Sequence, residues 1–209
     1  MKKAAVFAVI ATILVPAALA VDGTVLINQA TVLAAGGFPY RITQSGSYRL
    51  SGNLLADPNK QAIEIAANQV NLDLNGFKVE CSVTGSGAPL LFVCIGSSAS
   101  RDMVVRNGFV TLTAAGQPRL PNSDVVALLL GSNQVVLEDL KVHVEADPSY
   151  LRSSINTGAN SIVRNNVLSG NGFLFIACPA LIKGNINTGV GGAHEPPSTC
   201  VLSDNVGPF

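Results

Sequence analysis

The strongest constraint on this chain of 209 residues is a short motif that recurs along it. Each copy is a short apolar strand that runs into Asn, Asp or Gly and is followed by another apolar residue. The copies are VNLDLN (70–75), MVVRN (103–107), VVLED (135–139), IVRNNV (162–167), LIKGNI (181–186) and VLSDNV (201–206). Aligned on Leu72, Val105, Leu137, Val163, Ile182 and Leu202, they lie 33, 32, 26, 19 and 20 residues apart. Repeats of this length predict a solenoid, in which stacked neighbours bury one continuous core.

A second apolar strand precedes each of the first three anchors, at residues 62–65, 91–95 and 127–130, with Asn- and Ser-containing turns between the strands. No amphipathic helical pattern follows residue 21, which argues against βαβ units. We therefore predict an all-β, single-domain, right-handed parallel β-helix of about seven to eight coils. Residues 41–209 form this domain, and residues 21–40 supply an N-terminal cap and a lead-in strand.

The recurrent asparagines have a physical reason. A tight bend between strands needs a left-handed backbone, which Asn and Gly adopt most readily. Asn side chains stacked at such bends can hydrogen-bond along the axis. We expect a structural ladder made of Asn75, Asn107, Asn166, Asn185 and Asn205, with Asp139 at one rung.

The first twenty residues are typical of a secretory signal. Lys2 and Lys3 precede an apolar run that ends in Ala18-Leu19-Ala20, an A-x-A cleavage pattern. The alternative is a membrane anchor, but the uncharged stretch of 18 residues contains Pro16 and is short for a bilayer span. We predict cleavage after Ala20 and a secreted, periplasmic or cell-surface location.

Charge excludes some partners. Without residues 1–20 the chain has 11 basic and 13 acidic side chains, a net charge near −2. This balance gives no electrostatic case for nucleic acid or anionic lipid. No later stretch is long and apolar enough to span a membrane, so we expect no transmembrane span.

The stretch ITQSGSYRLSGNL (42–54), followed by AIEI (62–65) and VNLDLNGF (70–77), resembles the opening of bacterial right-handed parallel β-helix repeat proteins. These belong to the pectin-lyase-like superfamily, and the resemblance covers about residues 38–209. It implies the fold. The superfamily includes polysaccharide lyases, glycoside hydrolases, epimerases, adhesins and members without a known reaction, so it does not imply one activity.

Four cysteines follow residue 20, which suggests two disulfides in an oxidising compartment. Four cysteines allow three pairings, and free buried thiols are an alternative. We favour Cys81–Cys94, which would close a Gly- and Pro-containing excursion, and Cys178–Cys200, which lie in turns entering adjacent coils.

Candidate functional side chains are expected on the outward face of the strands. The residue after each anchor points outward because side chains alternate along a strand. These residues are Asp73, Arg106, Glu138, Arg164, Lys183 and Ser203. One interpretation is a polysaccharide-binding column; the other, which we favour, is salt bridging between unlike charges.

Enzyme signatures are incomplete. The paired Asp, N-T-D and G-H pattern of polygalacturonases is missing, and Asp73, Arg106 and Arg164 are the candidates if the protein is a polysaccharide lyase. Calcium is expected only in that case, and we predict no other cofactor or metal site. His143 is expected to face solvent and His194 to lie in a loop, neither at metal-ligand spacing.

We therefore expect a secreted protein that presents a polysaccharide- or envelope-binding or structural surface. The alternatives are a small lyase or hydrolase of an acidic glycan and an assembly module. For the last, the C-terminal rung shows no capping helix, and an open strand edge there would favour self-association.

Overall fold

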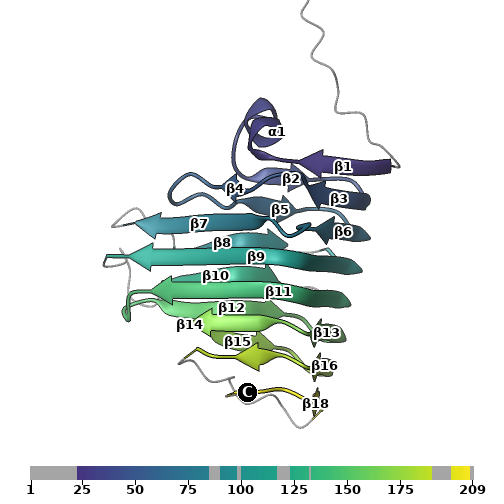
Figure 1. Ribbon diagram of the computed structural model, residues 1–209, viewed down its shortest axis with the longest axis vertical. Helices are drawn as coiled ribbons and strands as arrows, with labels where there is room; N and C mark the ends of the chain where they lie inside the picture. Colours follow the sequence, from purple (N-terminus) through teal and green to yellow (C-terminus); the bar gives the residue numbers. More distant parts are fainter. Residues whose placement is uncertain are drawn as a thin grey trace, which may run out of the picture.

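The computed structural model describes residues 23–84, 90–97, 100–116, 123–131, 133–189 and 199–207. The expected signal segment, residues 1–20, and His194 lie outside these residues. The described fold is all-β apart from one short helix, α1 (Gln29–Ala34), and its strand pairs are parallel (Figure 1). No helix in these ranges is long and apolar enough to cross a membrane.

The larger sheet has twelve strands, of which eight form its main path. In spatial order the eight are β1 (Thr24–Ile27), β3 (Gly46–Leu50), β6 (Val70–Asp73), β9 (Met103–Ala115), β11 (Val135–Ala146), β13 (Ser161–Arg164), β16 (Ala180–Lys183) and β18 (Val201–Ser203). Branching from this path are β4 (Leu54–Leu55), β7 (Lys78–Thr84), β14 (Val167–Gly170) and β17 (Ile186–Asn187). The later parts of the long strands β9 and β11 pair with this second group.

The smaller sheet has six strands. They are β2 (Tyr40–Ile42), β5 (Ile63–Ile65), β8 (Leu91–Ser97), β10 (Asp124–Leu130), β12 (Leu151–Thr157) and β15 (Phe173–Ile176). The chain passes repeatedly from one sheet to the other, and each new strand pairs with the strand of the preceding turn. We call one such turn a coil. This topology is compatible with a parallel β-helix.

The register confirms the alignment of the six anchors. Leu72 pairs with Val105, Val105 with Leu137, and the series continues through Val163 to Ile182 and Leu202. The first five are at most 2% exposed, because each is covered by the coils on both sides. The sequence predicted two strands in each coil, but the structure has a third strand segment. This segment is β7 in one coil and the later part of β9 or β11 in the next two.

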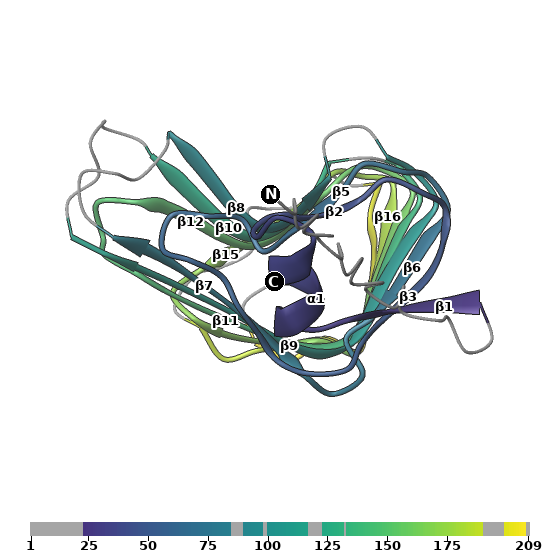
Figure 2. The same ribbon diagram turned by 90° about the horizontal axis from the view of Figure 1, so that it is seen from above.

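The helix α1 was not expected from the sequence, because six residues are too few to show helical periodicity. Asn28 accepts a hydrogen bond from the Thr31 amide, and the Thr31 hydroxyl accepts one from the Asn28 amide, a reciprocal capping box. Viewed along the long axis, α1 lies over the space that the coils enclose (Figure 2). Its Val32 is fully buried there. The helix thus covers the core at the end where a cap was expected.

Candidate functional site

The outward column is aligned as the sequence predicts. Asp73 pairs with Arg106, and the register continues coil by coil through Glu138, Arg164, Lys183 and Ser203. The structure adds Arg49, which pairs with Asp73 on the preceding coil and was missed. The alternation in Tyr48-Arg49-Leu50, with both neighbours buried, is the signal that could have found it. We call Arg49, Asp73, Arg106, Glu138, Arg164 and Lys183 the charged column.

Ion pairs join unlike charges along this column. Asp73 Oδ2 lies 3.7 Å from Arg49 Nη2 and 3.8 Å from Arg106 Nη2. The Glu138 carboxylate accepts hydrogen bonds from Arg164 Nε at 2.8 Å and from Arg164 Nη2. Lys183 Nζ lies 3.8 Å from Asp204, an exposed residue beside the column. The charged column therefore contributes ion pairs that join neighbouring coils.

The acids and bases of the column differ in exposure. The side chains of Asp73 and Glu138 are 12% and 14% exposed. Those of the four cations are 39–55% exposed: Arg49, Arg106, Arg164 and Lys183. Two carboxylates thus lie beneath four cations, so the column is two positive charges in excess. A molecule approaching this face meets the guanidinium groups of the three arginines before the carboxylates beneath them, and meets Lys183 together with its exposed partner Asp204.

The lyase candidates are only partly brought together. Arg106 lies beside Asp73, but Arg164 is three coils from Asp73, or about 14 Å at the spacing of parallel strands. The Arg106 coil separates the two carboxylates of the column. Within the described ranges, no three His, Cys, Asp or Glu side chains are placed to hold a metal ion. The column therefore does not fit the aspartate cluster that a calcium-dependent lyase requires.

The asparagines occupy two different positions. Asn166 Nδ2 and its amide donate to Asn185 Oδ1 at 3.0 and 2.9 Å, and Asn185 donates in the same way to Asn205 Oδ1 at 3.1 and 2.9 Å. Each Nδ2 also donates to a carbonyl oxygen of the preceding coil, those of Leu137, Val163 and Ile182. We call Asn166, Asn185 and Asn205 the amide ladder.

Asn75 and Asn107 stand outside the amide ladder, which corrects the sequence prediction. Both occupy the left-handed corner, with φ of 51° and 58°. Asp139 lies opposite Asn107 in the register of β11 and β9, so it shares this corner position. The amide ladder occupies the next position along the chain. Asn75 Nδ2 donates to the Leu50 carbonyl, and Asn107 Nδ2 donates to Asp73 Oδ1. These two side chains hold the corner and the Asp73 carboxylate.

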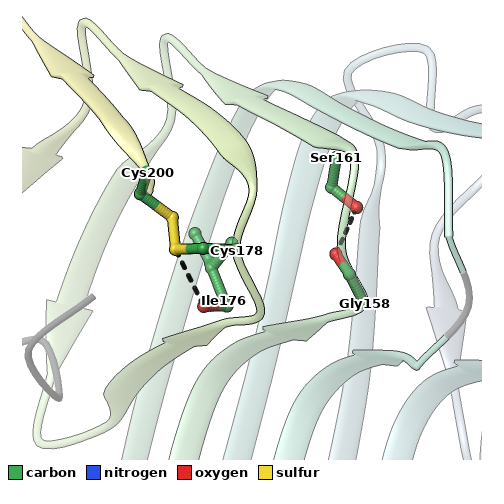
Figure 3. Close-up of a disulfide and its surroundings, with 5 residues drawn as sticks. All are labelled: Gly158, Ser161, Ile176, Cys178 and Cys200. Atoms are coloured by element: carbon green, nitrogen blue, oxygen red, sulfur yellow. Dashed lines mark hydrogen bonds between the residues drawn. A yellow bond between two sulfur atoms is a disulfide. The ribbon is translucent and has the colours of Figure 1, made fainter. Parts of the chain in front are cut away.

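Both disulfides have the pairing that the sequence favoured. The Cα atoms of Cys81 and Cys94 are 5.7 Å apart, and those of Cys178 and Cys200 are 5.1 Å apart. Figure 3 shows Cys178 in the turn that leads to β16 and Cys200 in the segment that leads to β18. This bridge ties the last described strand to the preceding coil. Two disulfides fit an oxidising, extracellular compartment.

His143 lies on the outer face of β11 and is exposed. Its Nδ1 is 3.0 Å from the hydroxyl of Ser169 on the neighbouring coil. The hydroxyl of Ser169 also lies 3.5 Å from the Val142 carbonyl oxygen. We assign this contact a role in joining β11 to β14.

No protein-family model, curated protein or solved structure matches this chain. The proposal that follows therefore depends on the geometry of the described faces.

Proposed function

We propose that this protein is an exported, right-handed parallel β-helix of the pectin-lyase-like type that binds an acidic polysaccharide through its charged column. Parallel crossover connections are almost always right-handed, and the eight-strand path fits about seven to eight coils. The signal-like N-terminus and the two disulfides support export. In this proposal the protein is a binding module without catalytic activity.

The observation that carries the binding proposal is the difference in exposure within the charged column. Asp73 and Glu138 hold the three arginines from below, while the guanidinium groups remain accessible. Adjacent coils are about 4.8 Å apart, so the cations between Arg49 and Lys183 span about 24 Å. An extended polyanion can contact several of them at once. A single exposed ion pair contributes at most about 1 kcal/mol, so binding requires several contacts and weakens with salt.

The test uses purified residues 21–209 with polygalacturonate, alginate and neutral dextran, and measures binding by isothermal titration calorimetry at low and high salt. We expect both acidic polymers to bind, dextran not to bind, and affinity to fall with salt. The double variant Arg49→Gln, Lys183→Gln should lose most of the affinity. The control Lys60→Gln, Lys141→Gln removes the same charge outside the column and should bind as the unaltered protein does.

Two outcomes would contradict this proposal. Equal loss of affinity in both double variants would mean that net charge, and not the column, drives binding. Release of an unsaturated, ultraviolet-absorbing product from either acidic polymer, with or without calcium, would show a polysaccharide lyase. Such a result would make Asp73, Arg106 and Arg164 the first residues to substitute.

A second candidate role, self-association, is favoured by the exposed end at β18. Leu202 belongs to the inward anchor column, yet it is 46% exposed, because no described strand follows β18. Val201 and Val206 are also exposed there. Because α1 covers the opposite end, we propose that a second copy pairs tail to tail through β18. Sedimentation velocity over a concentration series should show a dimer, and a monomer at every concentration would refute this role.

A further inference from the structure

The outer face of the smaller sheet contains a hollow of about 190 Å³. It lies over β5, β8 and β10, away from the charged column. It is lined by Gln61, Glu64, Leu91, Val93, Gly96 and Leu129 among others. The register places Gly96 between Glu64 and Leu129 in a column that continues through Asn156 and Phe175. Gly96 is the member of this column without a side chain, and the side chains of Val93 and Gln61 pack over its backbone beside the hollow.

The backbone does not require glycine at position 96. Gly96 has no left-handed φ, unlike the glycines at tight corners of this fold. A Cβ atom would first meet side chains, Val93 Cγ1 at 2.7 Å and Gln61 Nε2 at 2.9 Å, and the nearest backbone atom at 3.5 Å. Glycine inside a strand weakens it and often marks a place where a ligand approaches closely. Gly96 therefore lets the side chains of Val93 and Gln61 lie directly against the strand, and backbone conformation does not require it.

The lining combines an apolar wall with hydrogen-bond acceptors. Leu91, Val93 and Leu129 supply aliphatic surface. Gln61 Nε2 donates to the Ile63 carbonyl at 2.8 Å, which leaves the amide oxygen of Gln61 as the acceptor for a ligand. Glu64 supplies a carboxylate with two further acceptor oxygens. A matching ligand therefore has hydroxyl donors on one edge and C–H groups on a face.

The charge of the lining favours a neutral ligand. Arg41 binds the Glu64 carboxylate in a bidentate pair, with Nη2 3.1 Å from Oε1 and Nε 3.1 Å from Oε2. This pair has no net charge, so the lining offers neither an anion nor a cation an unpaired counter-charge. The lone pairs that remain on Glu64 can accept hydrogen bonds from hydroxyl groups.

The size of the hollow favours one sugar ring. A cavity of roughly 150 Å³ holds a single unsubstituted six-membered ring. Pockets for drug-sized ligands begin near 300 Å³. From the lining, the charge and the volume together, we propose that the Gly96 hollow binds one neutral pyranose unit. This site is separate from the charged column and does not depend on the proposed function.

The test titrates isotope-labelled residues 21–209, with both disulfides intact, with methyl glycosides of glucose, galactose, mannose and xylose. Amide chemical shifts in heteronuclear NMR spectra report where each sugar binds. We expect at least one neutral glycoside to shift the amides of Glu64, Gly96 and Leu129, with Kd of about 1–10 mM, the range for one small ring. Methyl galacturonide should bind more weakly than methyl galactoside, because its carboxylate would lose water without meeting an unpaired cation in the lining.

Three variants sharpen the test. Gly96→Ala places a methyl group against Val93 and Gln61, which must then shift within the lining, and should weaken binding at least about tenfold. Gln61→Ala leaves the strand backbone unchanged, removes an acceptor and should weaken binding too, so the test stands even if the first variant misfolds. Gly131→Ala is the matched control, because a Cβ there meets nothing within 4 Å. It should bind as the unaltered protein does.

The inference is overturned if no neutral glycoside shifts these three amides at about 50 mM, well above the expected Kd. It is also overturned if methyl galacturonide binds more tightly than methyl galactoside, or if Gly96→Ala and Gln61→Ala both bind as tightly as the unaltered protein. Binding of acidic polymers at the charged column can fail without changing any of these results.

Discussion

The amide ladder should stabilise the fold most where it is fully buried. Asn185 is the middle member and is fully buried. The change Asn185→Ala deprives the Asn166 amide of its acceptor at 2.9 Å and the Val163 carbonyl of a donor at 2.9 Å. It also removes both amide-to-amide contacts.

The magnitude follows from these lost contacts. An unsatisfied buried donor costs about 1–3 kcal/mol, and each further lost hydrogen bond costs about 1 kcal/mol. We therefore expect Asn185→Ala to lower the free energy of unfolding by about 4 kcal/mol. In a chain of this size each kcal/mol corresponds to roughly 2–4 °C, so Tm should fall by about 10 °C.

The assay is thermal unfolding followed by far-ultraviolet circular dichroism, with two comparisons. Asn205→Ala removes the same chemical group at the half-buried end of the ladder, where water can replace it, and should lower Tm by about 4 °C. Asn156→Ala, on the outer face of β12, should change Tm by less than about 2 °C. The reasoning is refuted if Asn185→Ala lowers Tm no more than Asn205→Ala does.

Three further predictions concern other parts of the fold. The double variant Cys178→Ser, Cys200→Ser opens a loop with a sequence separation of 22 and should lose about 3 kcal/mol in urea unfolding; a midpoint equal to that of the unaltered protein would contradict this. Gly170→Ala places a Cβ against the Val144 carbonyl at φ of 87°, so we expect a loss of about 3 kcal/mol in the same assay and not an unchanged midpoint. Burial raises the pKa of Asp124, whose Oδ1 has no hydrogen-bond partner in the described part of the chain. Because the pKa of Asp124 is raised in the folded state, protonated Asp124 contributes to the free energy of unfolding below the ordinary pKa of an aspartate. That contribution is lost as pH rises through the folded-state pKa. Asp124→Asn should therefore raise Tm at pH 7, with a gain that shrinks on acidification; a gain independent of pH would refute the assignment.

Much of the arrangement of the charged column could be predicted from the sequence alone. Side chains alternate along a strand, so one aligned buried residue per coil also places its outward neighbour. Aligning Leu72 with Val105 and Leu137 was therefore enough to place Asp73, Arg106 and Glu138 in one column. The same alignment put Cys178 and Cys200 on adjacent coils, close enough for a disulfide.

The division of the asparagines was decided by tertiary structure. Asp73 pairs with Arg106 and Lys78 with Phe109, so the corner after β6 holds two residues more than the corner within β9. The three residues of the amide ladder share one inward position on later, tighter corners. Motif similarity does not distinguish these positions, because an Asn suits both a left-handed corner and a buried amide stack.

The ion pairs and the Gly96 hollow also depend on tertiary contacts. The sequence places charges in a column, but the relative burial of carboxylates and cations comes from how deeply short and long side chains sit against the sheet. Likewise, Gly96 lines a hollow only because Glu64 and Leu129, which are 32 and 33 residues away in the sequence, lie beside it on the neighbouring coils. Local alternation determines which way each side chain points, and the stacking of coils determines what it meets.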